Sequence, residues 1–219
     1  MPADPFKFDG ILSMEKAKFI MKYAKYSVLD VGCHNGNLVA FLASQSYACF
    51  GMDINEDLII SAKQSFPQLQ FLVGSADNIP FHDKSFDTCI CLDVIEHVTN
   101  DLHTLRELAR IARHNIIIQV PREDEISLPS GVTYRHYIDP THNRYYTLET
   151  WYQIVNDANL KVEHIELVGR IRPALAYSNI GISKRLCRMI DNFFWYMARD
   201  HSLFRSAIRC VLLPKDLSL

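Results

Sequence analysis

Several features that would set this 219-residue chain apart from ordinary globular proteins are missing. It has no long uncharged apolar run of the kind that crosses a membrane, and the N-terminal MPADPFKFDG has no apolar signal core. Its six cysteines are scattered and contain no C-x-x-C pair, so neither a disulfide framework nor a zinc cluster is indicated. Internal repeats and low-complexity tracts are also absent. These absences predict a cytoplasmic protein with reduced thiols.

The charges are distributed unevenly. Residues 1–169 carry 14 Lys+Arg and 22 Asp+Glu, a net of −8, whereas residues 170–219 carry 9 and 3, a net of +6. A basic C-terminal part is compatible with weak peripheral contact at a membrane surface, or simply with a solvated face. The acidic remainder argues against nucleic acid as a partner. The oligomeric state is left open.

Short apolar runs alternate with helical patterns over the first 120 residues. Strands are expected around Val28 and at 47–52, 69–73, 86–92 and 115–120, with helices at 6–26 and 101–113 and after the first two strands. This alternation predicts an α/β fold with a parallel sheet and right-handed crossovers. Beyond it we expect a helix over 147–158, a strand over 160–168, a helix over 178–199 and a strand over 207–213.

The segment 122–146 interrupts that rhythm. It is too long for an ordinary connection and too rich in Tyr, His and Arg for a disordered one, so a functional loop is expected. We interpret the chain as a single domain: a helical lid (1–27), a ligand-binding core (28–120), a substrate loop (121–146) and C-terminal helices and strands (147–219).

The core begins with the stretch VLDVGCHNGNLVAF, which predicts a strand, a glycine loop and a helix. Gly32 and Gly36 would let the backbone approach a ligand, and Asp30 suits an ammonium group. Asp53 ends the next strand and can accept hydrogen bonds from two ribose hydroxyls. A dinucleotide fits poorly, because His34 and Asn37 stand where a dinucleotide loop has its second and third glycines.

Four segments in order, VLDVGCHNG, GMD, GSADNIPF and FDTCICLDVIEHV, resemble the class I S-adenosylmethionine-dependent methyltransferases of the small-molecule type. The resemblance covers about residues 28–120. It implies a Rossmann-like, doubly wound, mostly parallel seven-stranded sheet whose last strand is antiparallel, with lid insertions. It also implies S-adenosylmethionine as the cofactor.

Residue by residue, the resemblance places Asp30 and Gly32 at the methionine part of the cofactor, Asp53 at the ribose and the Ala76 N–H at the adenine. The family often has Asp at Ser75 and Gly at His34, so Asp77 is an alternative adenine ligand. The full set expected around the cofactor is Asp30, Gly32, Cys33, His34, Gly36, Asp53, Ile54, Ser75, Ala76, Asp77 and Asp93.

Histidines near the fourth strand and in the long loop are candidate general bases for a hydroxyl acceptor: His97, His136 and His142. An alternative is a divalent metal site. Asp93, Glu96 and His97 have helical i, i+3, i+4 spacing, and His142 or His136 could complete the set. Such a set resembles the metal sites of small-RNA and some quinone O-methyltransferases.

The sequence therefore predicts an S-adenosylmethionine-dependent methyltransferase acting on a small-molecule or glycan-like acceptor, with oxygen as the expected acceptor atom. Metal-assisted RNA or quinone-type O-methylation is the alternative within the same chemistry. A non-catalytic cofactor-binding protein and a nicotinamide oxidoreductase are the alternatives of other classes.

Overall fold

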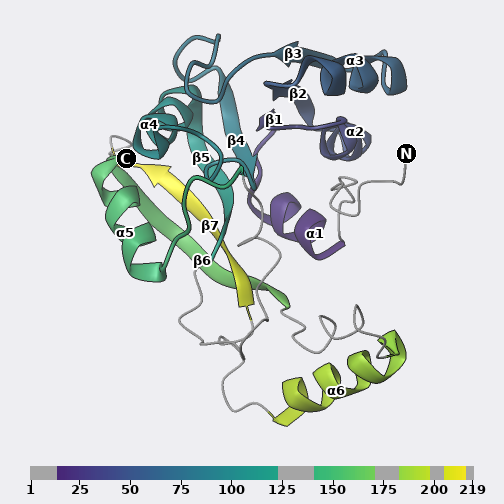
Figure 1. The fold of residues 1–219 in the computed structure, drawn as a ribbon. Helices are drawn as coiled ribbons and strands as arrows, with labels where there is room; N and C mark the ends of the chain where they lie inside the picture. The colour runs from purple at the N-terminus through teal and green to yellow at the C-terminus, as the bar shows by residue number, and fades with distance from the viewer. Residues whose placement is uncertain (1–13, 123–140, 171–182, 198–204, 216–219) are drawn as a thin grey trace.

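A computed structural model describes residues 14–122, 141–170, 183–197 and 205–215. Its strands form one seven-stranded sheet with the order β3-β2-β1-β4-β5-β7-β6 (Figure 1). They are β1 (Ser27–Val31), β2 (Ala48–Asp53), β3 (Gln70–Val73), β4 (Phe86–Leu92), β5 (Ala112–Pro121), β6 (Leu160–Arg170) and β7 (Arg205–Pro214). The pairs among β1 to β5 are parallel, and β7 is antiparallel to β5 and β6. The predicted doubly wound sheet with an antiparallel last strand is confirmed.

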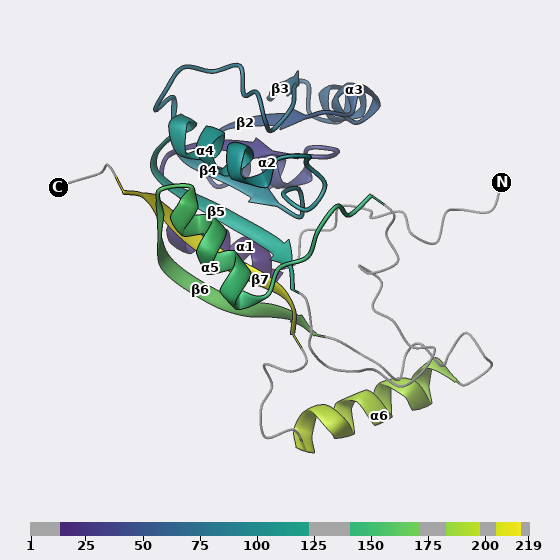
Figure 2. The ribbon, with the colours of Figure 1, turned by 60° about the vertical axis from the view of Figure 1, so that its left-hand side comes forward.

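Helices cover both faces of this sheet (Figure 2). They are α1 (Met14–Tyr23), α2 (Asn37–Ser44), α3 (Glu56–Ser65), α4 (Asp101–Ile111), α5 (Leu148–Asp157) and α6 (Lys184–Met197). Side chains of α4 and α5 share the main core cluster with one face of the strands. Those of α1 and α2 pack against the opposite face, and α3 packs with α2 and β3.

The hydropathy pattern explains why the sheet is central. Ile116, Ile117 and Ile118 of β5 are all fully buried, because alternate side chains meet helices on opposite faces. Cys89 and Cys91 of β4 lie on the same face, and all six cysteines are free thiols, as predicted.

Element boundaries differ from the predictions by a few residues. Helix α5 begins with a full capping box, in which Thr147 Oγ1 accepts from the Thr150 N–H at 3.1 Å, and Thr150 Oγ1 accepts from the Thr147 N–H at 3.0 Å. A Thr hydroxyl thus takes the role that Glu or Gln usually fills.

Some expected lid parts lie outside the described residues: the leader 1–13, most of the loop 121–146 with His136, and residues 178–182. Helix α1 packs on the sheet through buried Phe19 and Ile20. Helix α6 stands apart from the sheet in Figures 1 and 2. A lid function for these segments stays a prediction. Among the described residues, no helix combines the length and apolarity needed to span a bilayer.

Candidate active site

The predicted site residues gather at the carboxyl ends of β1 to β4. The strand order reverses between β1 and β4, which is where open α/β sheets bind ligands. Backbone hydrogen bonds tie these ends together: the Gly32 N–H donates to Met52 O at 2.7 Å and the Gly74 N–H to Asp53 O at 2.9 Å. Parallel pairing therefore assembles one site from four separate segments.

The loop after β1 has three residues in the left-handed conformation. Gly32 and Gly36 have φ values of 78° and 80°, and His34 has a φ of 51°, which histidine adopts more readily than most residues. The glycines serve packing as well: a Cβ on Gly32 would lie 2.2 Å from Val94 Cγ2, and one on Gly36 would lie 2.7 Å from Phe71. Protein atoms, not only a ligand, thus require glycine at these two positions.

Two carboxylates flank this loop. Asp53 Oδ2 accepts from the His34 N–H at 2.8 Å, and its Oδ1 accepts from the Asn55 N–H at 2.9 Å, which fixes the carboxylate at the end of β2. Asp30 is only 4% exposed. Burial, and then repulsion from Asp53, raise its pKa to about 7, while Lys16 acts in the opposite direction. A cationic ligand group beside Asp30 would stabilise its ionised carboxylate.

Cys33 and Ile54 form the apolar margins of the site. Burial, followed by the negative charges of Asp30 and Asp53, raises the pKa of the Cys33 thiol, so that it stays protonated. Its side chain is 5% exposed and borders the core. Ile54 follows Asp53 directly and is 74% exposed, an unusual state for a large aliphatic side chain, and so offers an apolar surface beside the β2 carboxylate.

The loop after β3 brings together the two side chains whose roles the sequence left open. Ser75 Oγ donates to Asp77 Oδ1 at 2.6 Å. The Asp77 carbonyl lies 2.9 Å from His103 Nε2, which anchors the loop to α4. Ala76, between them, is 8% exposed. Ser75 and Asp77 thus act as one hydrogen-bonded unit, in which Ser75 orients the carboxylate.

The end of β4 holds Asp93 in a left-handed conformation, with a φ of 56°. Its carboxylate accepts from Lys16 Nζ at 3.2 Å and from Gln119 Nε2 at 2.9 and 3.0 Å. Arg209 of β7 in turn donates to Gln119 Oε1 at 2.9 and 3.0 Å and to Glu166 Oε1 at 3.2 Å. This chain of polar groups runs across the sheet from α1 to β6.

Sequence reasoning missed Lys16, Gln119 and Arg209 as parts of the site. A signal for two of them was present: Gln119 interrupts the apolar run NIIIQV, and Arg209 interrupts AIRCVLL. Both are buried, at 8% and 4% exposure. A polar residue inside a buried strand needs a partner, so these two could have been paired in advance. Lys16 gave no comparable signal, because lysine is common on amphipathic helices.

Glu96, His97 and His142 come together beside this strand end. Their potential ligand atoms all lie within 4.8 Å of one another, and the two imidazole rings are 4.6 Å apart. Hydrogen bonds hold the turn at 96–97 to the end of the long loop: the Asn143 N–H donates to Glu96 O at 2.8 Å, and Asn143 Nδ2 donates to His97 O at 2.8 Å. His97 and His142 thus lie side by side, and His136, the alternative partner, lies outside the described residues.

The predicted helical spacing of Asp93, Glu96 and His97 is wrong. Residues 93–97 form a bend and a turn, and the left-handed Asp93 directs its carboxylate to Lys16 and Gln119. Asp93 is therefore not in the group formed by Glu96, His97 and His142. The i, i+3, i+4 rule holds only inside a helix, and here the chain turns before one begins.

The arrangement fits S-adenosylmethionine. The buried Asp30, whose pKa is raised, would gain from an ammonium group. Asp53 has a fixed carboxylate for ribose hydroxyls, and the Ser75–Asp77 pair offers an acceptor for an amino group of adenine. The metal alternative has the oxygen and nitrogen ligands that Mn²⁺ or Zn²⁺ would accept.

Comparison with known proteins agrees with this geometry. The family profile described as "Methyltransferase domain" matches residues 29–118. A ubiquinone biosynthesis O-methyltransferase of Rickettsia typhi is 26% identical over 203 residues, covering 86% of this chain and 79% of that protein. The uncharacterised methyltransferase YcgJ of Bacillus subtilis is 26% identical over 154 residues, covering 65% of this chain and 60% of that protein.

A solved structure shows the same fold. An S-adenosylmethionine-dependent methyltransferase from Archaeoglobus fulgidus superposes with a TM-score of 0.65 at 20% identity, covering 91% of each chain. The family profile, the curated relatives and the sheet topology agree. Residues 29–118 form a methyltransferase domain in a chain with the class I, S-adenosylmethionine-dependent fold, which implies S-adenosylmethionine as the cofactor.

Proposed function

We propose that this enzyme methylates a hydroxyl group of a small-molecule or glycan-like acceptor. The observation that carries the proposal is the pairing of His97 and His142 beside the carboxyl end of β4. His97 Nδ1 lies 3.0 Å from Thr141 Oγ1 and 3.2 Å from Thr141 O. When Nδ1–H donates to Thr141, Nε2 keeps its lone pair and can act as a base. A hydroxyl acceptor needs such a base.

The residues around the cofactor would position it. Asp30 would bind the ammonium of its methionine part, Asp53 the ribose hydroxyls, and the Ser75–Asp77 pair with the Ala76 N–H the adenine. S-adenosylmethionine supplies an activated methyl group on a positively charged sulfur. The protein contributes alignment and exclusion of water. His97 would take the acceptor's proton as the new C–O bond forms and the C–S bond breaks, leaving a neutral thioether.

The acceptor class follows from charge and from the neighbouring loop. Residues 1–169, which contain the site, carry a net charge of −8 and would repel a nucleic-acid backbone. Tyr145 lies with its ring 5.8 Å from the His142 ring, so aromatic and imidazole groups border the place where an acceptor would enter. Such a border suits a phenol or a sugar.

Two measurements test the proposal. Calorimetry should detect S-adenosylmethionine binding to the native chain, and Asp53→Ala should abolish it. An assay of cofactor turnover over a panel of phenols, quinols and sugars should then find an acceptor, with His97→Gln retaining cofactor binding while turnover falls about 10²- to 10⁴-fold. Full turnover in His97→Gln would reject His97 as the base.

A second candidate is metal-assisted methylation of a quinol-like acceptor. It is favoured by the Glu96, His97 and His142 cluster and by the relatives named as ubiquinone biosynthesis O-methyltransferases. The metal would lower the pKa of the acceptor hydroxyl directly. Two experiments separate the candidates. The first is metal analysis of the purified protein, and the second measures turnover after chelation, with and without added Mn²⁺ or Zn²⁺. Full activity of the chelated, metal-free protein would reject the second candidate.

A further inference from the structure

Helix α6 carries a group of large apolar side chains that are exposed. Leu186, Ile190 and Phe193 follow i, i+4, i+7 spacing, as do Met189, Phe193 and Tyr196, so the five side chains share one side of the helix. We call this set the α6 apolar face. All five are exposed: Leu186 49%, Met189 65%, Ile190 37%, Phe193 61% and Tyr196 85%. A contiguous group of this kind marks a binding surface.

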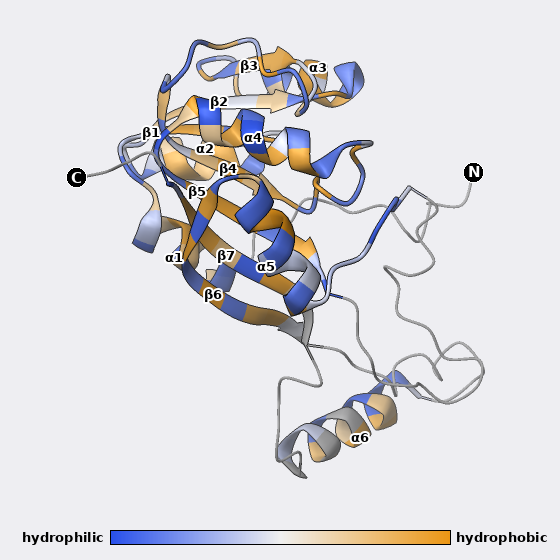
Figure 3. Ribbon diagram, turned by 90° about the vertical axis from the view of Figure 1, so that its left-hand side faces the viewer, coloured by the Kyte–Doolittle hydropathy of each residue, from blue (hydrophilic) through white to orange (hydrophobic). Residues whose placement is uncertain are grey.

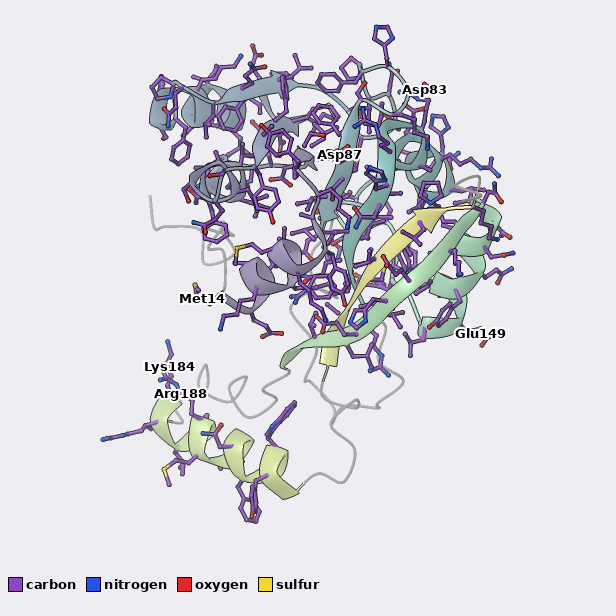
Figure 4. All side chains as sticks on the ribbon, turned by 180° about the vertical axis from the view of Figure 1, so that it is seen from behind. Met14, Asp83, Asp87, Glu149, Lys184 and Arg188 are labelled. Carbon is purple, nitrogen blue, oxygen red and sulfur yellow. The ribbon has the colours of Figure 1, made fainter. Side chains whose placement is uncertain are left out.

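The start of α6 is basic. Lys184, Arg185 and Arg188 lie in its first five residues, and all three are exposed (Lys184 and Arg188 are labelled in Figure 4). They belong to the C-terminal part with a net charge of +6, whereas residues 1–169 carry −8. In Figure 3 the helix shows both blue and orange segments, well separated from the sheet. Three of the nine basic residues of 170–219 therefore lie on the helix that carries the exposed apolar side chains.

We propose that α6 docks the enzyme on the surface of an anionic lipid bilayer. A helix with a strongly apolar face, a Lys/Arg-rich polar face and modest overall hydrophobicity lies in the plane of the membrane interface. The apolar face would enter the boundary between headgroups and acyl chains, while the long basic side chains reach the anionic headgroups. An acidic protein partner could match the charges, but a flat bilayer accepts all five apolar side chains without a preformed groove.

The test uses the full chain and vesicles, and does not depend on methyl transfer. Binding to vesicles of phosphatidylcholine alone should be weak, and it should strengthen strongly when about a third of the lipid is phosphatidylglycerol. Lys184→Gln with Arg188→Gln should weaken the second binding about 25-fold, at about fivefold for each charge removed. High salt should weaken it as well.

Substitutions in the α6 apolar face provide the second part of the test. Met189→Ser with Phe193→Ser should lower binding to anionic vesicles at least about tenfold. Ile60→Ser is the matched control, because Ile60 is exposed at 47% but lies on α3. Unchanged binding of S-adenosylmethionine in calorimetry confirms that each variant is folded.

Three outcomes would overturn the proposal. The first is an absence of binding to anionic vesicles, and the second is equal binding by the wild type and the Met189/Phe193 variant. The third is self-association of the wild type that the apolar changes abolish while vesicle binding persists, since the occupant would then be a second copy of the chain. None of these three outcomes depends on whether the protein transfers a methyl group.

Discussion

At the scale of single residues, Asp30 has the property with the most direct functional consequence. Its pKa of about 7 means that about half of the cofactor-free molecules carry a neutral Asp30 at neutral pH. An ammonium group binds the ionised form. We therefore expect affinity for S-adenosylmethionine to rise about fivefold between about pH 6 and pH 7. Calorimetry at both pH values measures this rise, and Asp30→Asn should give weak binding that is the same at both.

The same residue affects stability with a defined sign. Because the pKa of Asp30 in the folded protein lies above its ordinary value of 3.8, the unfolded chain releases this proton first as the pH rises. The cofactor-free protein therefore loses stability from about pH 4 to about pH 7 through this group. Urea unfolding across that pH range should show a smaller loss of unfolding free energy in Asp30→Asn than in the wild type.

Gly32 allows a test of the left-handed loop. In Gly32→Ala the new Cβ would face Val94 Cγ2 at 2.2 Å and would also strain a φ of 78°. We expect a loss of about 1–3 kcal/mol of stability, together with weaker cofactor binding. Adding Val94→Ala removes the contact but not the backbone strain, so it should restore only part of the loss. Full restoration would show that packing alone requires glycine there.

At the scale of elements, α5 owes its start to two hydroxyls. Thr150→Ala removes the bond to the Thr147 N–H and should cost about 0.5–2 kcal/mol, measured as a lower urea midpoint with an unchanged slope. Thr150→Glu places the usual capping-box partner at the same position and should keep the stability within about 0.5 kcal/mol of the wild type. Equal losses of stability in Thr150→Ala and Thr150→Glu would show that the Thr150 hydroxyl does not stabilise α5 by capping the Thr147 N–H.

Also at this scale, strands were easier to predict than turns. Residues 86–92 were predicted as a strand and form β4, because a buried run of alternating faces has few other solutions. The turn at 93–97 was misjudged as helical in spacing. Its shape depends on Lys16 and Gln119, which are distant in sequence and hold the Asp93 carboxylate.

At the scale of the whole molecule, the polar chain from Lys16 to Glu166 connects helix α1, the site and the far edge of the sheet. Arg209→Met would leave Gln119 Oε1 without its donors inside the sheet and should destabilise the protein by about 1–3 kcal/mol. Gln119→Leu with Arg209→Met should recover part of that loss, as the double variant replaces both polar groups. Urea unfolding of Gln119→Leu, Arg209→Met and the double variant, each compared with the wild type, measures the coupling.

The sheet followed from the sequence, and because parallel strands end at one edge, they bring Asp30, Asp53 and Asp93 together there regardless of the loops. The chain through Gln119 and Arg209 was not predicted because it joins side chains of two strands that are distant in sequence, and it arises only after the sheet has assembled. The bond between Ser75 and Asp77 is local, but it depends on the shape of the loop after β3.

The place of β7 has a consequence for how the protein is made. It inserts between β5 and β6, so Arg205–Pro214 supply the interior strand of this half of the sheet. During synthesis, β5 and β6 emerge from the ribosome before the strand that lies between them has been translated. Until β7 has emerged, the strand edges of β5 and β6 that it will pair stay open. This half of the sheet therefore assembles after the half that holds β1 to β4, and it is the stage at which a chaperone would have most to protect.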